Sequence, residues 1–98
     1  MIYSLTIRKE AEADLAEAYE YYELCHTNLG SDLLLCIEEA FERITKSPLH
    51  YQIIYKDIRR SLSKRFPYGI YYTIRGPSII VLAVLHARKE PMHWKIRS

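Results

Sequence analysis

The sequence predicts an α+β fold of the order β-α-α-β-β-β, in which an antiparallel helical hairpin covers one face of a mainly antiparallel sheet and a short tail follows. Residues 9–46 repeat apolar side chains with helical spacing, and a break at 28–31 divides them into two helices. β-Branched and aromatic residues concentrate after residue 50. Because the later strands follow one another after the helices, the sheet is expected to be mainly antiparallel.

A strand hairpin is expected at the centre of this sheet. Residues 70–75 are β-branched and aromatic, residues 76–78 (Gly-Pro-Ser) have turn chemistry, and residues 79–85 are continuously apolar. An apolar run without polar alternation is typical of a strand that is covered on both faces. Three arginines flank the hairpin: Arg65, Arg75 and Arg88.

The first strand, from Ile2 to Arg8, is expected at an edge of the sheet. Its residues alternate, so that one face is apolar and the other is mostly polar. The apolar face consists of Tyr3, Leu5 and Ile7.

Two amphipathic helices follow. The first is predicted from Lys9 to about Thr27, with acidic residues in its first turns, where the helix dipole favours them. Its apolar stripe consists of Ala11, Leu15, Ala18, Tyr22 and Cys25. The second helix runs to about Lys46 and stops before Pro48, because a residue that precedes proline avoids the α region. Its stripe consists of Leu33, Ile37, Ala40, Phe41 and Ile44.

The segment between the helices and the central hairpin is less regular. One strand is predicted within 52–59 at most, and residues 62–66 are predicted to start the next strand. Residues 67–69 (Pro-Tyr-Gly) suit a bulge or bend within that strand. In the tail, Pro91 suits the first turn of a short terminal helix.

Length and composition predict a single domain spanning 1–98 in the cytoplasm. No apolar run reaches the roughly 20 residues that cross a membrane, and residues 1–8 are too short for a signal segment. There is no glycine-rich phosphate loop, and Cys25 and Cys36 fit no metal or redox motif. The histidines are scattered, so neither a metal nor a cofactor is expected: His26, His50, His86 and His93.

Charge is distributed unequally along the chain. Residues 1–50 contain ten Asp/Glu and four Lys/Arg, whereas residues 51–98 contain two Asp/Glu and ten Lys/Arg, so the halves carry −6 and +8. Such asymmetry indicates an anionic partner, either nucleic acid or an acidic protein segment. The alternative is that the two halves pair their charges within the chain.

Two groups of residues are candidates for a functional surface. The first helix ends in tyrosines (Tyr19, Tyr21 and Tyr22), which either cover the margin of the core or form a docking surface. The second group is cationic and aromatic, with Tyr71 as a neighbour: Arg59, Arg60, Lys64, Arg65, Arg88 and Trp94. It suits phosphate contact, base stacking or an acidic protein. Alternatively, Trp94 covers the core and the arginines pair with acids of the first helix.

Several segments of the chain resemble one protein family. They are Asp57–Arg60, Arg65–Tyr72 (Arg-Phe-Pro-Tyr-Gly-Ile-Tyr-Tyr), Val81–Pro91 with Trp94, and the helix segment Ala13–Tyr22. In this order and at this chain length they resemble the RelE/ParE superfamily of toxins from type II toxin–antitoxin systems. The resemblance is closest to the ParE-like, plasmid-stabilisation branch, whose β-α-α-β-β-β fold agrees with the order predicted above.

The resemblance implies a protein partner, namely a cognate antitoxin whose C-terminal segment wraps the helical hairpin and reaches the sheet. The residues expected to bind it are Leu15, Tyr19, Tyr22 and Phe41. The surface expected to bind the cellular target is cationic: Arg59, Arg60, Arg65, Arg88 and Trp94.

The resemblance leaves two activities open. RelE-like members cut mRNA on the ribosome with basic strand residues, an arginine after the last strand and an aromatic in the tail. Here Arg88 matches that arginine, but Trp94 stands where a catalytic tyrosine is expected, and Gly69 stands where a further arginine is expected. Cleavage needs a base, charge stabilisation and an acid, and this set is incomplete. The departures favour a ParE-like protein that binds DNA gyrase without chemistry of its own. An mRNA interferase and a non-toxic family member remain the alternatives.

Overall fold

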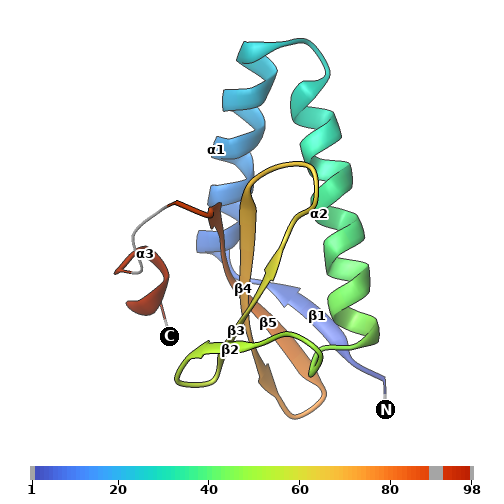
Figure 1. Ribbon diagram of the computed structural model, residues 1–98, viewed down its shortest axis with the longest axis vertical. Helices are drawn as coiled ribbons and strands as arrows, with labels where there is room; N and C mark the ends of the chain where they lie inside the picture. The colour runs from blue at the N-terminus through green and yellow to red at the C-terminus, as the bar shows by residue number, and fades with distance from the viewer. Residues whose placement is uncertain (1, 89–91, 98) are drawn as a thin grey trace.

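The computed structural model describes residues 2–88 and 92–97. The chain runs through one edge strand, a pair of long helices, four further strands and a final helical turn (Figure 1). In chain order the elements are β1 Ser4–Ile7, α1 Lys9–Cys25, α2 Leu29–Lys46, β2 Ile53–Tyr55, β3 Ile58–Leu62, β4 Tyr68–Arg75, β5 Ser78–His86 and α3 Met92–Lys95.

The strands form one sheet of order β1-β5-β4-β3-β2. β1 runs parallel to β5, and every other neighbouring pair is antiparallel. The two long helices pack side by side against one face of the sheet, whereas α3 lies away from them (Figure 1). This arrangement confirms the predicted α+β class, the mainly antiparallel sheet, the helical hairpin on one face and the edge position of the first strand.

The main core lies between the helices and the sheet. Alanines on α1 allow close approach to β5, and the inner stripe of α2 fills the remaining space. From the helices it buries Ala11, Ala18, Leu33, Ile37, Ala40 and Ile44, and from the sheet it buries Ile70, Tyr72, Ile79, Val81 and Val84. The predicted stripes are therefore correct at most positions, although Phe41 is only half-buried and Cys25 is exposed.

A second, smaller core covers the opposite face of the sheet. It contains Ile58, Tyr71, Leu82, Ala83, Leu85 and Trp94. β4 and β5 are therefore buried on both faces, as their apolar sequences predict. An irregularity in register makes this possible, since Tyr71 lies opposite Ala83 while Tyr72 lies opposite Val81. The extra residue, Leu82, turns with Ala83 toward the second core.

The structure corrects the prediction between residues 52 and 69. The single strand expected within 52–59 is two strands, β2 and β3, because Lys56 adopts a left-handed conformation (φ 52°) and reverses the chain. The expected strand start at 62–66 is wrong. β3 ends at Leu62, and the Ser63 N–H donates to the Tyr68 carbonyl (2.9 Å), which closes the connection to β4.

Two further sequence predictions, a bulge and a terminal helix, can be compared with the structure. The bulge expected within 67–69 lies instead between Tyr71 and Tyr72, since β4 begins at Tyr68. A short terminal helix is present as α3, while Pro91, which suggested it, lies outside the described residues. Within residues 2–88 and 92–97, no helix has the length and apolarity to cross a membrane.

The helical hairpin is closed by a tight contact at Gly30. A Cβ atom at this position would lie 2.6 Å from the Tyr19 carbonyl oxygen, so that only glycine lets the two backbones approach this closely. Glu23 accepts hydrogen bonds from the N–H groups of Gly30 (2.9 Å) and Asn28 (3.1 Å). A carboxylate of α1 thus supplies acceptors to the first turn of α2, whose N-cap residue Asn28 makes no side-chain capping bond.

Candidate functional site

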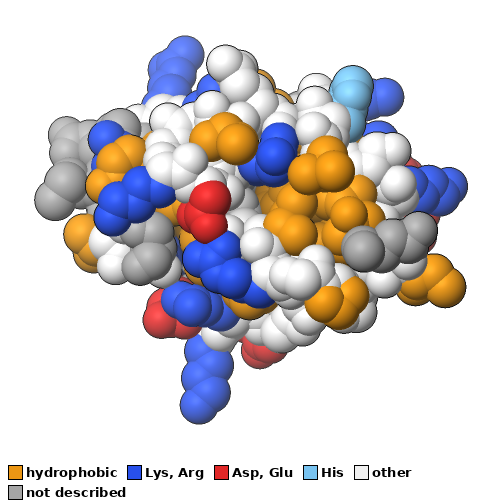
Figure 2. Space-filling view, turned by 90° about the horizontal axis from the view of Figure 1, so that it is seen from below, with side chains coloured by type: hydrophobic (Ala, Val, Ile, Leu, Met, Phe, Trp, Pro, Cys, Tyr) orange, Lys and Arg blue, Asp and Glu red, His pale blue; other side chains and the backbone are white. Residues whose placement is uncertain are grey.

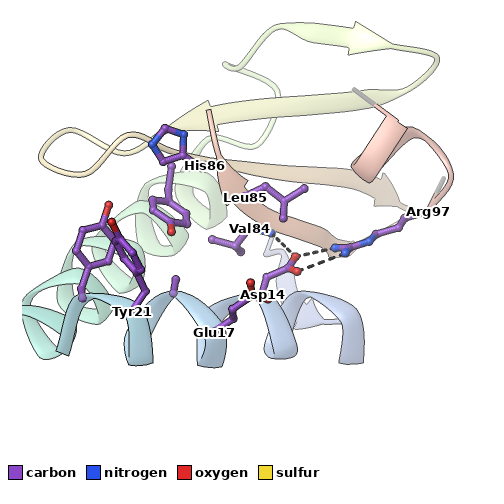
Figure 3. A pocket seen from close by; sticks show the side chains of 10 residues that line it. Asp14, Glu17, Tyr21, Val84, Leu85, His86 and Arg97 are labelled. Atoms are coloured by element: carbon purple, nitrogen blue, oxygen red, sulfur yellow. Dashed lines mark hydrogen bonds and ion pairs between the residues drawn. The ribbon is translucent and has the colours of Figure 1, made fainter. Parts of the chain in front are cut away.

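A hollow in the surface lies along an open edge of β5. β1 pairs with β5 only from Ser78 to Val81, so the edge of β5 beyond Val81 lacks a strand neighbour among the described residues. A cleft of about 380 Å³ lies there, between α1 and the end of the sheet (Figure 3). It is lined by Asp14, Glu17, Ala18, Tyr21, Tyr22, Tyr68, Val84, Leu85, His86 and Arg97.

One end of the cleft is closed by an ion pair between α1 and the tail. Arg97 Nη1 lies 2.6 Å from Asp14 Oδ2, and Arg97 Nη2 donates to Asp14 Oδ1 at 3.3 Å. The same two side chains also bind the strand edge, because Asp14 accepts the Val84 N–H (3.0 Å) and Arg97 donates to the Leu82 carbonyl (3.3 Å). The two side chains are 10% and 21% exposed, so their attraction is only partly screened by solvent.

Aromatic rings form the other end of the cleft. Tyr22 packs edge-on against Phe66, with ring centroids 5.1 Å apart, and against Tyr68 at 6.1 Å. Tyr21 packs edge-on against Tyr22 at 5.0 Å. Burial, assisted by the neighbouring Tyr22 and Glu17, raises the pKa of Tyr68 to about 12. Burial likewise raises the pKa of Tyr22.

His86 closes the wall that faces these rings. Its ring lies 5.7 Å from the Tyr68 ring, measured between centroids. Its Nδ1 accepts the backbone N–H of Arg88 at 3.1 Å. The contact fixes the direction in which the chain leaves β5.

The residues predicted to bind an antitoxin do not form one surface. Tyr22 lines the cleft, whereas Tyr19 lies at the seam between the helices, against Gly30. Leu15 is half-buried and packs against the main core. Phe41 lines a separate shallow pocket of about 300 Å³, together with Leu5, Glu42, Thr45 and Lys46.

Most of the cleft could not be found from the sequence pattern. Asp14 and Arg97 are separated by 83 positions, and Asp14 and Val84 by 70. The available signal was limited to the tyrosine-rich end of α1, which identified Tyr21 and Tyr22 as candidates.

The opposite face of the sheet carries part of the predicted target-binding set. Arg60 pairs across the strands with Tyr71, so its side chain points to the face of the second core. Trp94 stacks on Tyr71, with ring centroids 4.9 Å apart and an interplanar angle of 16°. Because Trp94 is 5% exposed, its indole serves as the cover of the second core.

The remaining predicted arginines differ in how far they are engaged within the chain. Arg59 donates to the carbonyls of Leu49 (3.3 Å) and Tyr51 (2.6 Å), which holds the connection between α2 and β2. Arg65 lies 3.4 Å from Asp32 and over the ring of Phe66. Arg88 is exposed. These arginines therefore do not form a single cluster.

The space beside Gly69 is tight for a side chain. A Cβ atom there would lie 3.0 Å from the Tyr71 hydroxyl oxygen and 3.1 Å from two of its ring carbons. Trp94 stacks on this ring and limits its movement. The space above Gly69 is therefore occupied by Tyr71.

The charge asymmetry is relieved in part within the chain. Among the described residues, Arg65 with Asp32 and Arg97 with Asp14 are ion pairs that join the basic half to the acidic half. Among the charged side chains seen in Figure 2, cationic ones cover more of the surface than acidic ones, and a hydrophobic patch lies beside them. In the described part of the chain, no group of three His, Cys, Asp or Glu residues is arranged to hold a metal ion.

Comparison with known proteins gives consistent results. A family model described as the ParE toxin of type II toxin–antitoxin system, parDE, matches residues 5–91. The solved chromosomal ParDE toxin–antitoxin system from P. aeruginosa is similar in structure, with 18% identity, a TM-score of 0.79 and coverage of 87% of this chain and 96% of that chain. The toxin–antitoxin complex RelBE2 from Mycobacterium tuberculosis has 17% identity, a TM-score of 0.61 and coverage of 88% and 99%. At these low sequence identities, the two structural similarities show a shared fold alone. No curated protein sequence matches the chain.

Proposed function

Because the chain belongs to the ParE toxin family of type II toxin–antitoxin systems, we propose that it inhibits growth by binding DNA gyrase in the cytoplasm. A cognate antitoxin neutralises it, and the pair serves to stabilise the plasmid or chromosomal segment that encodes it. The observation that carries the choice of binding over chemistry is the filled space above Gly69.

Cleavage of mRNA would require a base for the 2′-hydroxyl, donors for the developing charge and an acid for the leaving oxygen. At Gly69 the ring of Tyr71 would have to shift to admit a further cationic side chain. Trp94 has no hydroxyl to act as an acid, and its indole is buried. Arg88 alone matches a residue expected of a nuclease, and one cation cannot supply all three roles. These features favour a protein that acts by binding.

The target surface that we propose includes Arg60, on the face of the sheet opposite the helices, and Arg88, which follows the end of β5. Arg88 is exposed, and Arg60 is half-buried beside the second core. Arg65 contributes at the margin, because its ion pair with Asp32 is exposed and easily exchanged. Trp94 supports this face from within through its stack on Tyr71, whereas Arg59 pairs with Tyr72 on the helix side and holds the connection between α2 and β2.

The test is a supercoiling assay with purified gyrase and relaxed plasmid. The chain is expected to inhibit supercoiling or to trap broken DNA, and Arg88→Ala is expected to lower its potency roughly tenfold, as the loss of one charge-assisted contact does. Arg75→Ala is the matched control, since Arg75 pairs with Asp57 at the far end of the β4–β5 hairpin. Normal supercoiling at saturating concentrations of the chain would contradict gyrase as the target.

The position of Arg88, after the last strand, is also the one observation that favours a second function, cleavage of mRNA on the ribosome. That function predicts cuts in the ribosomal A site of a translating extract, and Arg88→Ala would abolish them. Growth arrest with intact transcripts would exclude it. If expression of the chain alone leaves growth unchanged, the non-toxic alternative holds.

A further inference from the structure

β1 has an open edge on the side away from β5. The Ser4 N–H donates to the Pro77 carbonyl at 2.9 Å. At the other end of the strand, the Arg8 N–H donates to the Val81 carbonyl at 3.1 Å. Since successive residues of a strand direct their backbone groups to opposite edges, three residues direct theirs outward: Tyr3, Leu5 and Ile7. No strand among residues 2–88 and 92–97 pairs with this outer edge.

The sequence of this edge lacks most of the features that protect edge strands from pairing. Such strands are commonly protected by charged side chains, proline, a bulge or short length. The opposite edge strand, β2, has three residues, an irregular register and Lys56 directly after it. Residues 2–7 (Ile-Tyr-Ser-Leu-Thr-Ile) contain no charged residue and no proline, and Ile2 is 93% exposed. β1 therefore relies on its short length alone.

An apolar groove continues this edge onto α2. It has a volume of about 300 Å³ and lies where β1 passes the C-terminal half of α2 (Figure 1). Its lining consists of Leu5, Phe41, Glu42, Thr45 and Lys46. Leu5 and Phe41 are half-buried, so part of each apolar side chain is open to solvent. Residues 3–7 and this groove together form the β1–α2 surface.

The charges on the β1–α2 surface are complementary to one another. Glu42 and Lys46 are exposed and lie one turn apart on α2. In the described part of the chain, however, neither forms an ion pair, with the other or with a third residue. Their charges cancel, so the surface offers little attraction to a strongly charged partner. A surface that carries one acid and one base suits a copy of itself, arranged about a twofold axis.

A twofold axis through Leu5 would satisfy the open edge. With β1 antiparallel to the β1 of a second copy, Leu5 lies opposite Leu5, and Tyr3 lies opposite Ile7. In this register every outward N–H and C=O between positions 3 and 7 finds a partner. On the face away from the helices, Ser4 of one copy lies opposite Thr6 of the other, which is a favourable cross-strand pair.

The same axis brings the two α2 helices together. The α2 residues of the groove surround Leu5, and Leu5 lies on the axis, so segments 41–46 of the two copies run antiparallel beside each other. Glu42 of each copy thus comes toward Lys46 of the other. The two apolar grooves join into one covered space between the Phe41 side chains, as in the core of an isologous interface.

We propose that the chain forms a symmetric homodimer through the β1–α2 surface, with β1 paired to β1 and Glu42 paired with Lys46 across the axis. A second copy supplies the uncharged edge, the apolar wall and the two charges in reversed order. The cleft along β5 shares no lining residue with this surface, so the dimer leaves that cleft open. The proposal goes beyond the proposed function, because it concerns the chain alone and is independent of the cellular target.

Sedimentation velocity of the full chain, from roughly micromolar to roughly millimolar concentration, measures the dimer. The unchanged chain is expected to dimerise. Glu42→Lys and Lys46→Glu are each expected to weaken the dimer at least roughly tenfold, because each replaces two attractive pairs by two repulsive ones. Glu20→Lys is the matched control, since Glu20 is an exposed carboxylate on α1 outside this surface, and its effect is expected to stay within about twofold. A monomer at every concentration, or an equal effect of the control, would overturn the proposal.

A mixture of the two charge-reversed variants tests the pairing across the axis. Glu42→Lys carries two bases at these positions and Lys46→Glu carries two acids, so a mixed dimer again pairs opposite charges. The mixture is expected to associate about as tightly as the unchanged chain. A mixed dimer no tighter than the dimer of either variant alone would show that Glu42 and Lys46 do not meet.

Hydrogen exchange tests the pairing of the strands. The amides of Leu5 and Ile7 are expected to exchange at least roughly tenfold more slowly where the dimer predominates than at high dilution. The Ser4 amide is the internal control, because it already binds the Pro77 carbonyl. Unchanged exchange at Leu5 and Ile7 would overturn the strand pairing. If these amides are protected only after the protein of the neighbouring reading frame is added, that protein covers the surface and the homodimer is wrong.

Discussion

Tyr71 determines what position 69 can hold. Its ring occupies the space where a Cβ of residue 69 would point, and it stacks on Trp94. A sequence comparison would describe Gly69 as the place where an arginine is missing. The structure adds the physical reason, because a neighbour in the same strand already fills the space.

The first prediction concerns this stack. Gly69→Arg should lower the free energy of unfolding by about 1–3 kcal/mol, since the new side chain must displace a ring held from two sides. Urea denaturation followed by the fluorescence of Trp94 measures the change. The same substitution should not create ribonuclease activity in a translating extract.

A double-mutant cycle supplies the control. Tyr71→Leu removes the ring, so Gly69→Arg should cost less in that background than in the unchanged chain. If the cost is the same in both backgrounds, the ring does not exclude a side chain at this position.

At the scale of elements, α3 has few residues and is held by few contacts. Its attachment depends on Trp94, which stacks on Tyr71, and on Arg97, which binds Asp14 and the Leu82 carbonyl. Arg8 adds a hydrogen bond to the Arg97 carbonyl (3.1 Å). The tail thus contacts α1 on one face of the sheet, the edge of β5, and the second core on the opposite face.

The second prediction tests this attachment. Asp14→Ala should cost about 3 kcal/mol of stability, because it leaves the Arg97 guanidinium and the Val84 N–H without their shared acceptor. It should also shift the emission of Trp94 to longer wavelength, as α3 loosens and water reaches the indole. Arg65→Ala is a useful control, since its ion pair with Asp32 is 59% and 42% exposed and should contribute less than about 1 kcal/mol. Equal costs for the two variants would show that Asp14 has no special role.

The elements also show which parts of the fold the sequence could predict. The central hairpin was predicted because residues 79–85 are apolar throughout, and the edge strand because Tyr3, Leu5 and Ile7 alternate with polar residues. The division of 52–59 into two strands was missed, because it depends on a left-handed lysine rather than on a glycine. Such a conformation is uncommon enough that residue type does not reveal it.

At the scale of the whole molecule, the sequence predicted where charged residues concentrate but not which of them form ion pairs. The acidic helices and basic strands were evident, but the pairs that join them connect residues 83 and 33 positions apart. The candidate cleft was missed for the same reason. Its walls come from α1, β4, β5 and the tail, and no local pattern relates Glu17 to His86.

Buried tyrosines give the whole molecule a dependence on alkaline pH, which is the last prediction. Burial raises the pKa of both Tyr68 and Tyr72 to about 12, against an ordinary value of about 10. Folding therefore favours their protonated forms. The resulting stability is fully present below about pH 10 and is lost as the pH rises from about 10 to about 12, by about 3 kcal/mol for each group.

Urea denaturation at pH 8 and pH 11 measures this loss, and Tyr72→Phe separates the two sources of stability at that residue. At pH 8 the variant should be less stable by about 1 kcal/mol, because the Tyr72 hydroxyl donates to the Pro48 carbonyl at 2.6 Å and fixes the end of α2. Between pH 8 and pH 11 the variant should lose less stability than the unchanged chain, since one buried phenol no longer ionises. An equal loss in both proteins would mean that Tyr72 ionises with its ordinary pKa, and that water reaches the main core beneath Pro48.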